Sequence, residues 1–346
     1  GDSDRPGDQQ VKKFNFDIEI LDDDVTPPKI TIFEEVFGWS FYITDEDGYI
    51  DSNATGIYKL YDTNGSLWDI GVIEEEGKLY YVKIPFRPGN YILQINATNN
   101  DLEWQGDEEI LVQTDPKNIT LEYCFLFVDQ KIEDLKTYLD NHLYSILVSF
   151  IRCKLKLAQY SLRDAFELLM EGDLTSSLFR DAVAQTLLKI AEFETWFFDK
   201  INLIDDDVVE FIIFSLQEIR NFVILIMGNS VDYIKQTDIG YEIAQLDVAL
   251  FDLKDYFYNE IGCWSGKYLR MLISMAACQL ESTFFKLSMD MNISYSLSLA
   301  QYTLNLAENE VERLLNYGKI DESIANYIFD VISNIIQEIE EIKEKI

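Results

Sequence analysis

Proline is missing from two thirds of this sequence. All six prolines and ten of the sixteen glycines lie in the first 116 residues, and the remaining 230 residues contain no proline. Because proline breaks helices and is frequent in the turns between strands, this boundary predicts a β domain followed by an all-α domain.

Histidine and the common catalytic motifs are also scarce. His142 is the only histidine, so Ser-His-Asp or Cys-His catalysis would need His142 itself, and a zinc site with several histidine ligands is excluded. No Walker A, GxGxxG, GxSxG, HExxH or CxxC motif occurs. Carboxylates alone can hydrolyse glycosides, but none of the 62 acidic residues stands out as a pair. We therefore expect no enzymatic activity.

Long apolar runs and positive charge are lacking as well. The most apolar stretch, 211–227, is interrupted by Gln217, Glu218, Arg220 and Asn221 and predicts a buried central helix rather than a membrane span. The chain begins at Gly1 without an initiator methionine, so a signal peptide or a membrane anchor can lie outside it. The net charge is −34. This charge repels phosphate backbones and anionic lipid, and we expect no nucleic-acid partner.

Glycosylation sequons are more frequent than chance predicts. Asn-x-Ser/Thr occurs at Asn53, Asn64, Asn96, Asn118 and Asn292. Four of the five fall in the first 120 residues, where a turn-rich β domain can also concentrate Asn, Ser and Thr. We interpret the sequons as glycosylation sites rather than as a result of turn composition, which predicts an extracellular or cell-surface glycoprotein.

Short segments with alternating apolar and polar residues recur about every ten residues before position 116. They span 14–20, 29–33, 39–44, 56–61, 68–73, 79–84, 91–97 and 109–113. Turn residues separate them, so we expect a disordered tail over 1–11 and an antiparallel β-sandwich over 12–116.

Four motifs in this β segment carry a family resemblance. They are, in chain order, DDDxTPP at 22–28, WxxxIxDxDG at 39–48, PGxY at 88–91 and ATNND at 97–101. Together they resemble the Ig-like, cadherin- or PKD-like modules of archaeal and bacterial cell-surface proteins, over roughly residues 12–114. The resemblance implies an Ig-like sandwich that acts as a stalk or adhesive spacer. The segment lacks the cysteine pair of antibody-type domains.

The second part of the chain repeats a helical hairpin. The hexapeptide LAQYSL at 157–162 returns as LAQYTL at 299–304, and a weaker echo lies at 243–248. Both copies run into a glycine, Gly172 or Gly318, followed by a capping Asp or Thr, which predicts an αα-hairpin used at least twice.

The helix boundaries follow from apolar spacing. Apolar residues at 139, 143, 146, 150, 153, 157 and 160 step by four and three, which predicts one helix of about 40 residues from an N-cap at Asp129, or two coaxial helices. Further helices are expected at 175–202, 205–227, 230–259, 264–289, 292–316 and 320–345. The prediction is an α+β multidomain chain with a linker or docking segment at 117–128 and an antiparallel bundle of six to seven helices over 129–346. Most Tyr and Phe residues are expected in cores or interfaces.

Two candidate sites remain. Asp45, Asp47 and Asp51 lie in a loop with a glycine that is similar to oxygen-rich Ca²⁺ loops, so calcium is the possible cofactor, and a plain acidic turn is the alternative. Four cysteines allow three pairings. Pairing neighbours in sequence would join distant points along one helix, and two bridges would require the segment after Cys124 to fold back. We predict one bridge, between Cys153 and Cys278; four free thiols are the alternative.

These features predict a non-enzymatic, extracellular cell-surface protein with a structural or adhesive role. Its partner would be a protein or a cell-surface polymer, bound by the helical domain as a partner-binding or assembly module. The competing hypothesis is a secreted carbohydrate-active or ligand-binding protein with its site at the interdomain junction.

Overall fold

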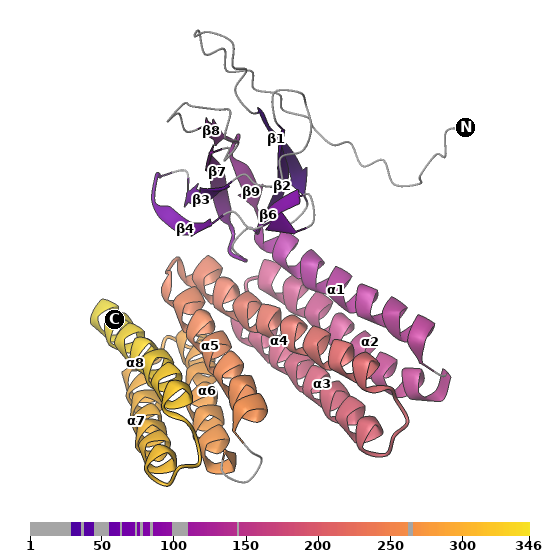
Figure 1. Cartoon of the computed structure of the whole chain (residues 1–346), viewed down its shortest axis with the longest axis vertical. Coiled ribbons are helices and arrows are strands. Elements are labelled where there is room, and N and C mark those ends of the chain that lie inside the picture. Colours follow the sequence, from indigo (N-terminus) through magenta and orange to yellow (C-terminus); the bar gives the residue numbers. More distant parts are fainter. Residues whose placement is uncertain are drawn as a thin grey trace. The chain divides into compact units, whose positions relative to one another are not determined.

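A computed structural model of the chain describes residues 29–35, 38–44, 55–62, 64–72, 75–76, 79–83, 86–98, 110–143, 145–261 and 266–346. The chain forms two compact units, Gly1–Thr120 and Leu121–Ile346 (Figure 1). The first contains β-strands and the second α-helices, as the proline boundary predicts.

The described part of the first unit forms two antiparallel sheets. One has the strand order β1-β2-β6-β5, and the other has the order β4-β3-β7-β8, with β9 also paired to β7. The strands are β1 (Lys29–Glu35), β2 (Gly38–Thr44), β3 (Thr55–Asp62), β4 (Leu67–Val72), β5 (Glu75–Glu76), β6 (Leu79–Lys83), β7 (Gly89–Thr98), β8 (Ile110–Gln113) and β9 (Lys117–Ile119). Seven of the eight predicted strands are confirmed; 14–20 lies outside the described residues.

Alternation of side chains places the core of this unit. In β2, Trp39, Phe41 and Ile43 are buried, and so is Ser40 between them, while the ring of Phe41 stacks on that of Tyr80 in β6. In β7, Tyr91, Leu93 and Ile95 are buried, and the Tyr91 hydroxyl donates a hydrogen bond of 3.0 Å to the carbonyl oxygen of Arg87. The period of two that the sequence shows therefore buries one face of β7, whereas β2 is buried on both faces.

The described part of the second unit contains eight helices, one or two more than predicted. They are α1 (Leu121–His142), α2 (Ser145–Met170), α3 (Leu174–Lys200), α4 (Asp206–Lys235), α5 (Ile239–Glu260), α6 (Lys267–Ser288), α7 (Ser294–Asn316) and α8 (Glu322–Lys345). They pack as two layers of four (Figure 1). In one layer α2 packs on α3, α3 on α6 and α6 on α7; in the other, α1 packs on α4, α4 on α5 and α5 on α8. The pairs α1–α2, α3–α4, α5–α6 and α7–α8 join the layers.

The predicted hairpin stops are confirmed. Gly172 between α2 and α3 has φ +87°, and Gly318 between α7 and α8 has φ +61°, both in the left-handed region that glycine adopts without strain. The Asp173 carboxylate accepts a hydrogen bond from the Ser176 backbone N–H at 3.0 Å and caps α3. The repeated hexapeptide lies on α2 and α7, the two edge helices of one layer.

Two boundary predictions are wrong. Residues 117–128 are not a linker: β9 occupies 117–119, and α1 begins at Leu121 because Leu121, Cys124 and Val128 belong to its buried face. The predicted long helix is also interrupted, since α1 ends at His142 and α2 begins at Ser145, and the two helices pack side by side in opposite directions. Arg152 in the first half of α2 contacts Asp140 near the end of α1 at 2.5 Å, and Arg163 in the second half of α2 contacts Asp129 in the first half of α1 at 2.9 Å, as an antiparallel pair requires.

Gly228 does not end a helix as predicted. It lies inside α4, where a Cβ would overlap the carbonyl oxygen of Gly240 in α5 and the side chain of Ala244. The absence of side chains at both glycines lets the two backbones approach closely, so this glycine serves packing rather than a turn.

Candidate functional site

The layer of α2, α3, α6 and α7 exposes large apolar side chains on its outer side. On α2 they are Phe150, Leu157 and Tyr160, each between 47% and 51% exposed, with the exposed Cys153 between them. Their spacing of three, four and three residues is that of a helix face that packs against another helix. The stripe is instead open to solvent.

The other three helices of this layer carry matching stripes. The exposed large apolar residues are Phe179, Ile190, Phe193, Trp196 and Phe197 on α3, Tyr268, Met271 and Met275 on α6, and Tyr295 and Tyr302 on α7, together with Met170 at the end of α2. Together with Phe150, Leu157 and Tyr160 of α2 they define what we call the aromatic face. Next to it, the salt bridge between Lys154 and Glu194, at 2.6 Å, ties α2 to α3.

Each of these helices has a second apolar stripe that faces inward. On α2 this inner stripe consists of Ile151, Leu155, Ala158 and Leu162, all at most 2% exposed. A soluble helix ordinarily has one apolar stripe, which packs on the core. The outer stripes are therefore a second set of apolar side chains that the packing of the unit leaves exposed.

Charge separates the two layers in the same way. Helices α2, α3, α6 and α7 carry 10 acidic and 11 basic residues, a net charge of +1. Helices α1, α4, α5 and α8, which we call the acidic layer, carry 21 acidic and 7 basic residues, a net charge of −14. Within the helices, the first layer exposes 14 large apolar side chains and the acidic layer five. The helical unit thus has one layer with exposed apolar side chains and almost no net charge, and one layer that is polar and acidic.

Between the layers lies a cluster of buried charges centred on Arg220 of α4, which is 4% exposed. Its guanidinium contacts Glu192 of α3 at 2.8 Å and lies 4.4 Å from the ring centre of Phe251 in α5. Its backbone oxygen accepts a hydrogen bond of 2.8 Å from the Gln185 side chain. A buried cation held by an anion and an aromatic ring fixes how the helices pack. Sequence patterns did not single out Arg220.

Two further buried carboxyl groups lie on α3 and α5. Asp181 on α3 is 0% exposed, and burial raises its pKa well above the usual value of 3.8. Asp247 on α5 is 2% exposed; burial and then the nearby Glu281 carboxylate raise its pKa well above the usual range. Desolvation disfavours a carboxylate anion, so burial favours the neutral form of both groups.

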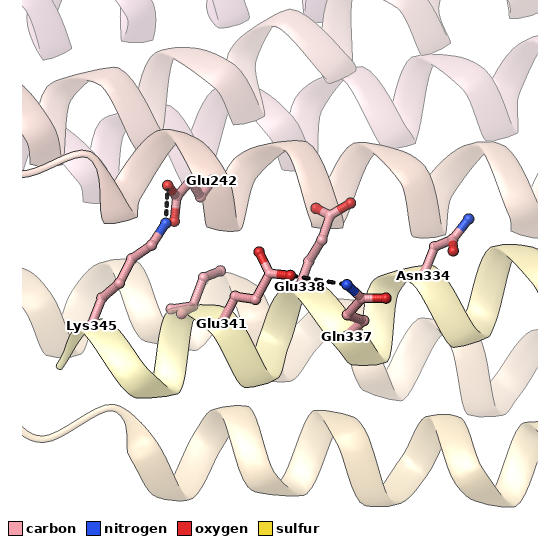
Figure 2. A pocket seen from close by; sticks show the side chains of 7 residues that line it. Glu242, Asn334, Gln337, Glu338, Glu341 and Lys345 are labelled. Carbon is pink, nitrogen blue, oxygen red and sulfur yellow. Dashed lines mark hydrogen bonds and ion pairs between the residues drawn. The ribbon is translucent and has the colours of Figure 1, made fainter.

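The acidic layer contains a hollow of about 420 Å³ between α5 and α8 (Figure 2). It is lined by Glu242, Asn334, Gln337, Glu338, Glu341, Ile342 and Lys345. The Lys345 ammonium contacts Glu242 at 2.5 Å, and Gln337 donates a hydrogen bond of 3.0 Å to Glu341. Burial, followed by Glu341 and Glu242, raises the pKa of Glu338. The hollow has the electrostatics of a site for a cationic group.

The predicted glycosylation sites have different surroundings. Asn64, Asn118 and Asn292 are exposed, whereas Asn96 is half-buried in the central strand β7, and Asn53 lies outside the described residues. The proposed calcium ligands Asp45, Asp47 and Asp51 also lie outside them. Among the described residues, no group of three or more His, Cys, Asp or Glu side chains is arranged to hold a metal ion.

The predicted disulfide is not formed. Cys153 and Cys278 are free and exposed. They do not pair because Cys153 lies on α2 and Cys278 on α6, and α3 packs between these two helices. Both thiols border the aromatic face instead. Cys124 is free and buried. His142 is exposed at the end of α1, where its ring stacks on Tyr138 at a centroid distance of 4.0 Å.

One helix in the described part of the chain, α4, is long and apolar enough to cross a membrane by length and composition. Half of its most apolar window is buried in this unit, where α4 packs against α1, α3, α5 and α6. These contacts agree with the central helix predicted at 211–227.

Comparisons with known proteins found no relative of this chain: no family model, no curated protein and no solved structure matches it. The surface chemistry of the chain itself is therefore the basis for assigning a function.

Proposed function

We propose that this chain is a non-enzymatic protein of the cell surface. In this proposal the helical unit assembles with a protein partner through the aromatic face, and the β unit is an Ig-like spacer. The observation that carries the proposal is the segregation of exposed apolar side chains to one layer and of negative charge to the other.

The composition of the aromatic face supports a protein partner. Interface cores are enriched in Tyr, Trp, Phe and Met and depleted in charge, and the large exposed residues of this face are mostly Phe, Tyr and Met. Monomeric proteins rarely expose large contiguous apolar patches, and such patches mark interaction sites. A four-helix face offers such residues on rigid elements, which favours a defined docking geometry.

Two features of the β unit support an Ig-like spacer. Its strand orders, β1-β2-β6-β5 and β4-β3-β7-β8, correspond to the A-B-E-D and C′-C-F-G orders of Ig-type sandwiches. The hydrogen bond from the Tyr91 hydroxyl to the Arg87 carbonyl oxygen resembles the tyrosine corner of those domains. The PGxY motif that carried the sequence resemblance is the segment that makes this bond.

Exposure of three sequons supports the extracellular assignment. N-linked glycans are bulky and need an exposed Asn, and Asn64, Asn118 and Asn292 meet this condition. Intact-mass measurement on protein from its native host tests it. Glycan additions that disappear in the Asn64→Gln, Asn118→Gln and Asn292→Gln variants are expected; an unmodified mass counts against a glycoprotein.

Site-specific photo-crosslinking in the native host tests the assembly role. A benzophenone amino acid would replace Phe193, which is 62% exposed on the aromatic face, or Phe214, which is 65% exposed on the acidic layer. We expect a light-dependent protein adduct from position 193 and none from position 214. Protease added to intact cells should digest this adduct, because the proposal places it on the cell surface. Adducts from neither position, or from both equally, would overturn the proposal.

A further inference from the structure

We infer that the occupant of the aromatic face is a second copy of this chain, so that two helical units pack face to face with their acidic layers outward. The inference rests on the proposed function, because it names the partner of the same surface. Three properties of the face carry it: its size, its charge and the likeness of its two edges.

The size of the face suits a permanent dimer. The four helices have 22 to 27 residues each. At a rise of about 1.5 Å per residue and a spacing of about 10 Å between helices, they form a face of roughly 1,400 Å². Two such faces in contact bury about 2,800 Å², within the roughly 2,000–5,000 Å² of obligate homodimers.

The charge of the face favours its own copy over other partners. With 11 basic and 10 acidic residues in these helices, two copies meet without net repulsion. Their acidic layers, at −14 each, then point away from each other. A surface of anionic lipid would need an excess of clustered Lys and Arg to attract this face. The near balance of charges does not provide that excess.

The two edges of the face are chemically alike. The repeated hexapeptide places Leu157 and Tyr160 on α2 and Leu299 and Tyr302 on α7, and α2 and α7 are the edge helices of the layer. Both tyrosines are exposed, at 49% and 60%. A two-fold dimer needs one surface that complements itself. Like edges allow the α2 edge of one copy to lie over the α7 edge of the other.

Sedimentation of the purified full chain tests the inference. We expect a mass of about twice 40.3 kDa at micromolar concentration. The double variant Ile190→Lys/Met275→Lys places charges on α3 and α6 in the middle of the face, and we expect it to sediment as a monomer. The control Phe214→Lys/Tyr327→Lys changes two side chains of similar exposure on the acidic layer and should remain a dimer.

A thiol reaction reports directly on the covered face. In a Cys263→Ser background, maleimide should label Cys153 and Cys278, the two free thiols that border the face, slowly in the dimer and faster in the Ile190→Lys/Met275→Lys variant. Cys124 should not interfere, because burial raises its pKa to about 12. Circular dichroism checks that each variant is folded.

Several results would overturn the inference. They are a monomer at every concentration, a dimer that both double variants leave intact, and a monomer that floats with phosphatidylcholine or phosphatidylglycerol vesicles. If the Phe193 crosslink in cells contains a different protein, the proposed assembly role stands and the second copy is wrong. If no crosslink forms and the purified chain is a monomer, both fail.

Discussion

The two helix layers have similar helices and opposite surfaces. Both layers bury aliphatic inner stripes against each other, such as Leu155 and Leu162 in one layer and Leu216 and Val223 in the other. The formal charges of their helices differ by 15, from +1 to −14. The comparison teaches that the fold uses only the inner stripes, whereas the outer stripes of α2, α3, α6 and α7 are available for an interaction.

Neighbouring leucines on α2 provide the sharpest test of this difference. Leu155 is 0% exposed and Leu157 is 47% exposed. Leu155→Ala is expected to lower the free energy of unfolding by about 2–5 kcal/mol, because it leaves a cavity in the core. Leu157→Ala should change it by less than about 0.5 kcal/mol. Urea unfolding in the Ile190→Lys/Met275→Lys background measures both without a contribution from association. Equal losses would show that the outer stripe belongs to the core.

The close approach of α4 and α5 tests how the acidic layer is held together. Gly228→Ala introduces a methyl group where the Gly240 carbonyl oxygen lies. The helices must separate, and we expect a loss of about 1–3 kcal/mol in the free energy of unfolding. Ala replaces Gly in a helix, which alone would favour folding by up to about 1 kcal/mol. Unchanged or increased stability in urea unfolding would contradict this packing.

The pH dependence of stability tests whether Asp181 is buried on the inner side of α3. Its pKa is raised in the folded state, so the unfolded chain releases its proton from about pH 3.8 upward while the folded chain keeps it. The contribution of Asp181 to stability is therefore complete below that pH and is lost as the pH rises, by about 1.4 kcal/mol per pH unit up to the folded pKa. Asp181→Asn stays neutral and should be more stable than wild type at pH 7.

Urea unfolding of both proteins from pH 4 to pH 8 measures this effect. Asp164→Asn, on the exposed side of α2, is the control and should follow wild type. If the free energies of unfolding of wild type and Asp181→Asn change with pH in the same way, the raised pKa of Asp181 is contradicted.

The smallest expected effect concerns the charge of the acidic layer. Glu338 lies near Glu341 and Glu242, and burial with these two charges raises its pKa. Glu338→Gln should increase the free energy of unfolding at pH 7 by a few tenths of a kcal/mol, since like charges three or four residues apart cost about that much. The gain should vanish in 1 M salt and at low pH. Glu167→Gln, on α2 of the other layer, should give no gain in low salt.

Much of the fold could be predicted from local signals. Proline distribution, strand alternation and the glycines Gly172 and Gly318 act on nearby backbone, so their effects are readable from sequence. The α1–α2 turn was missed because the apolar spacing continues through 143–145, and Gly228 was misread because its partner, Gly240, is brought near it only by packing. The predicted calcium loop lies outside the described residues.

The aromatic face was seen in part. Phe150, Leu157 and Tyr160 were recognised as one apolar face of a predicted helix, and most Tyr and Phe residues were expected in cores or interfaces. The buried stripe is the one through Leu155, Ala158 and Leu162, which has the same spacing. Spacing identifies an apolar face but does not say which of two such faces meets the rest of the protein.

By itself, the sequence determined the division into a β unit and a helical unit, the hairpin stops and the excess of negative charge, because these depend on residue type and on neighbours along the chain. The tertiary structure alone decided which helices share a layer, and hence that the aromatic residues collect on one side and the acids on the other. These properties depend on contacts between helices distant in sequence, and single-helix periodicity does not record them.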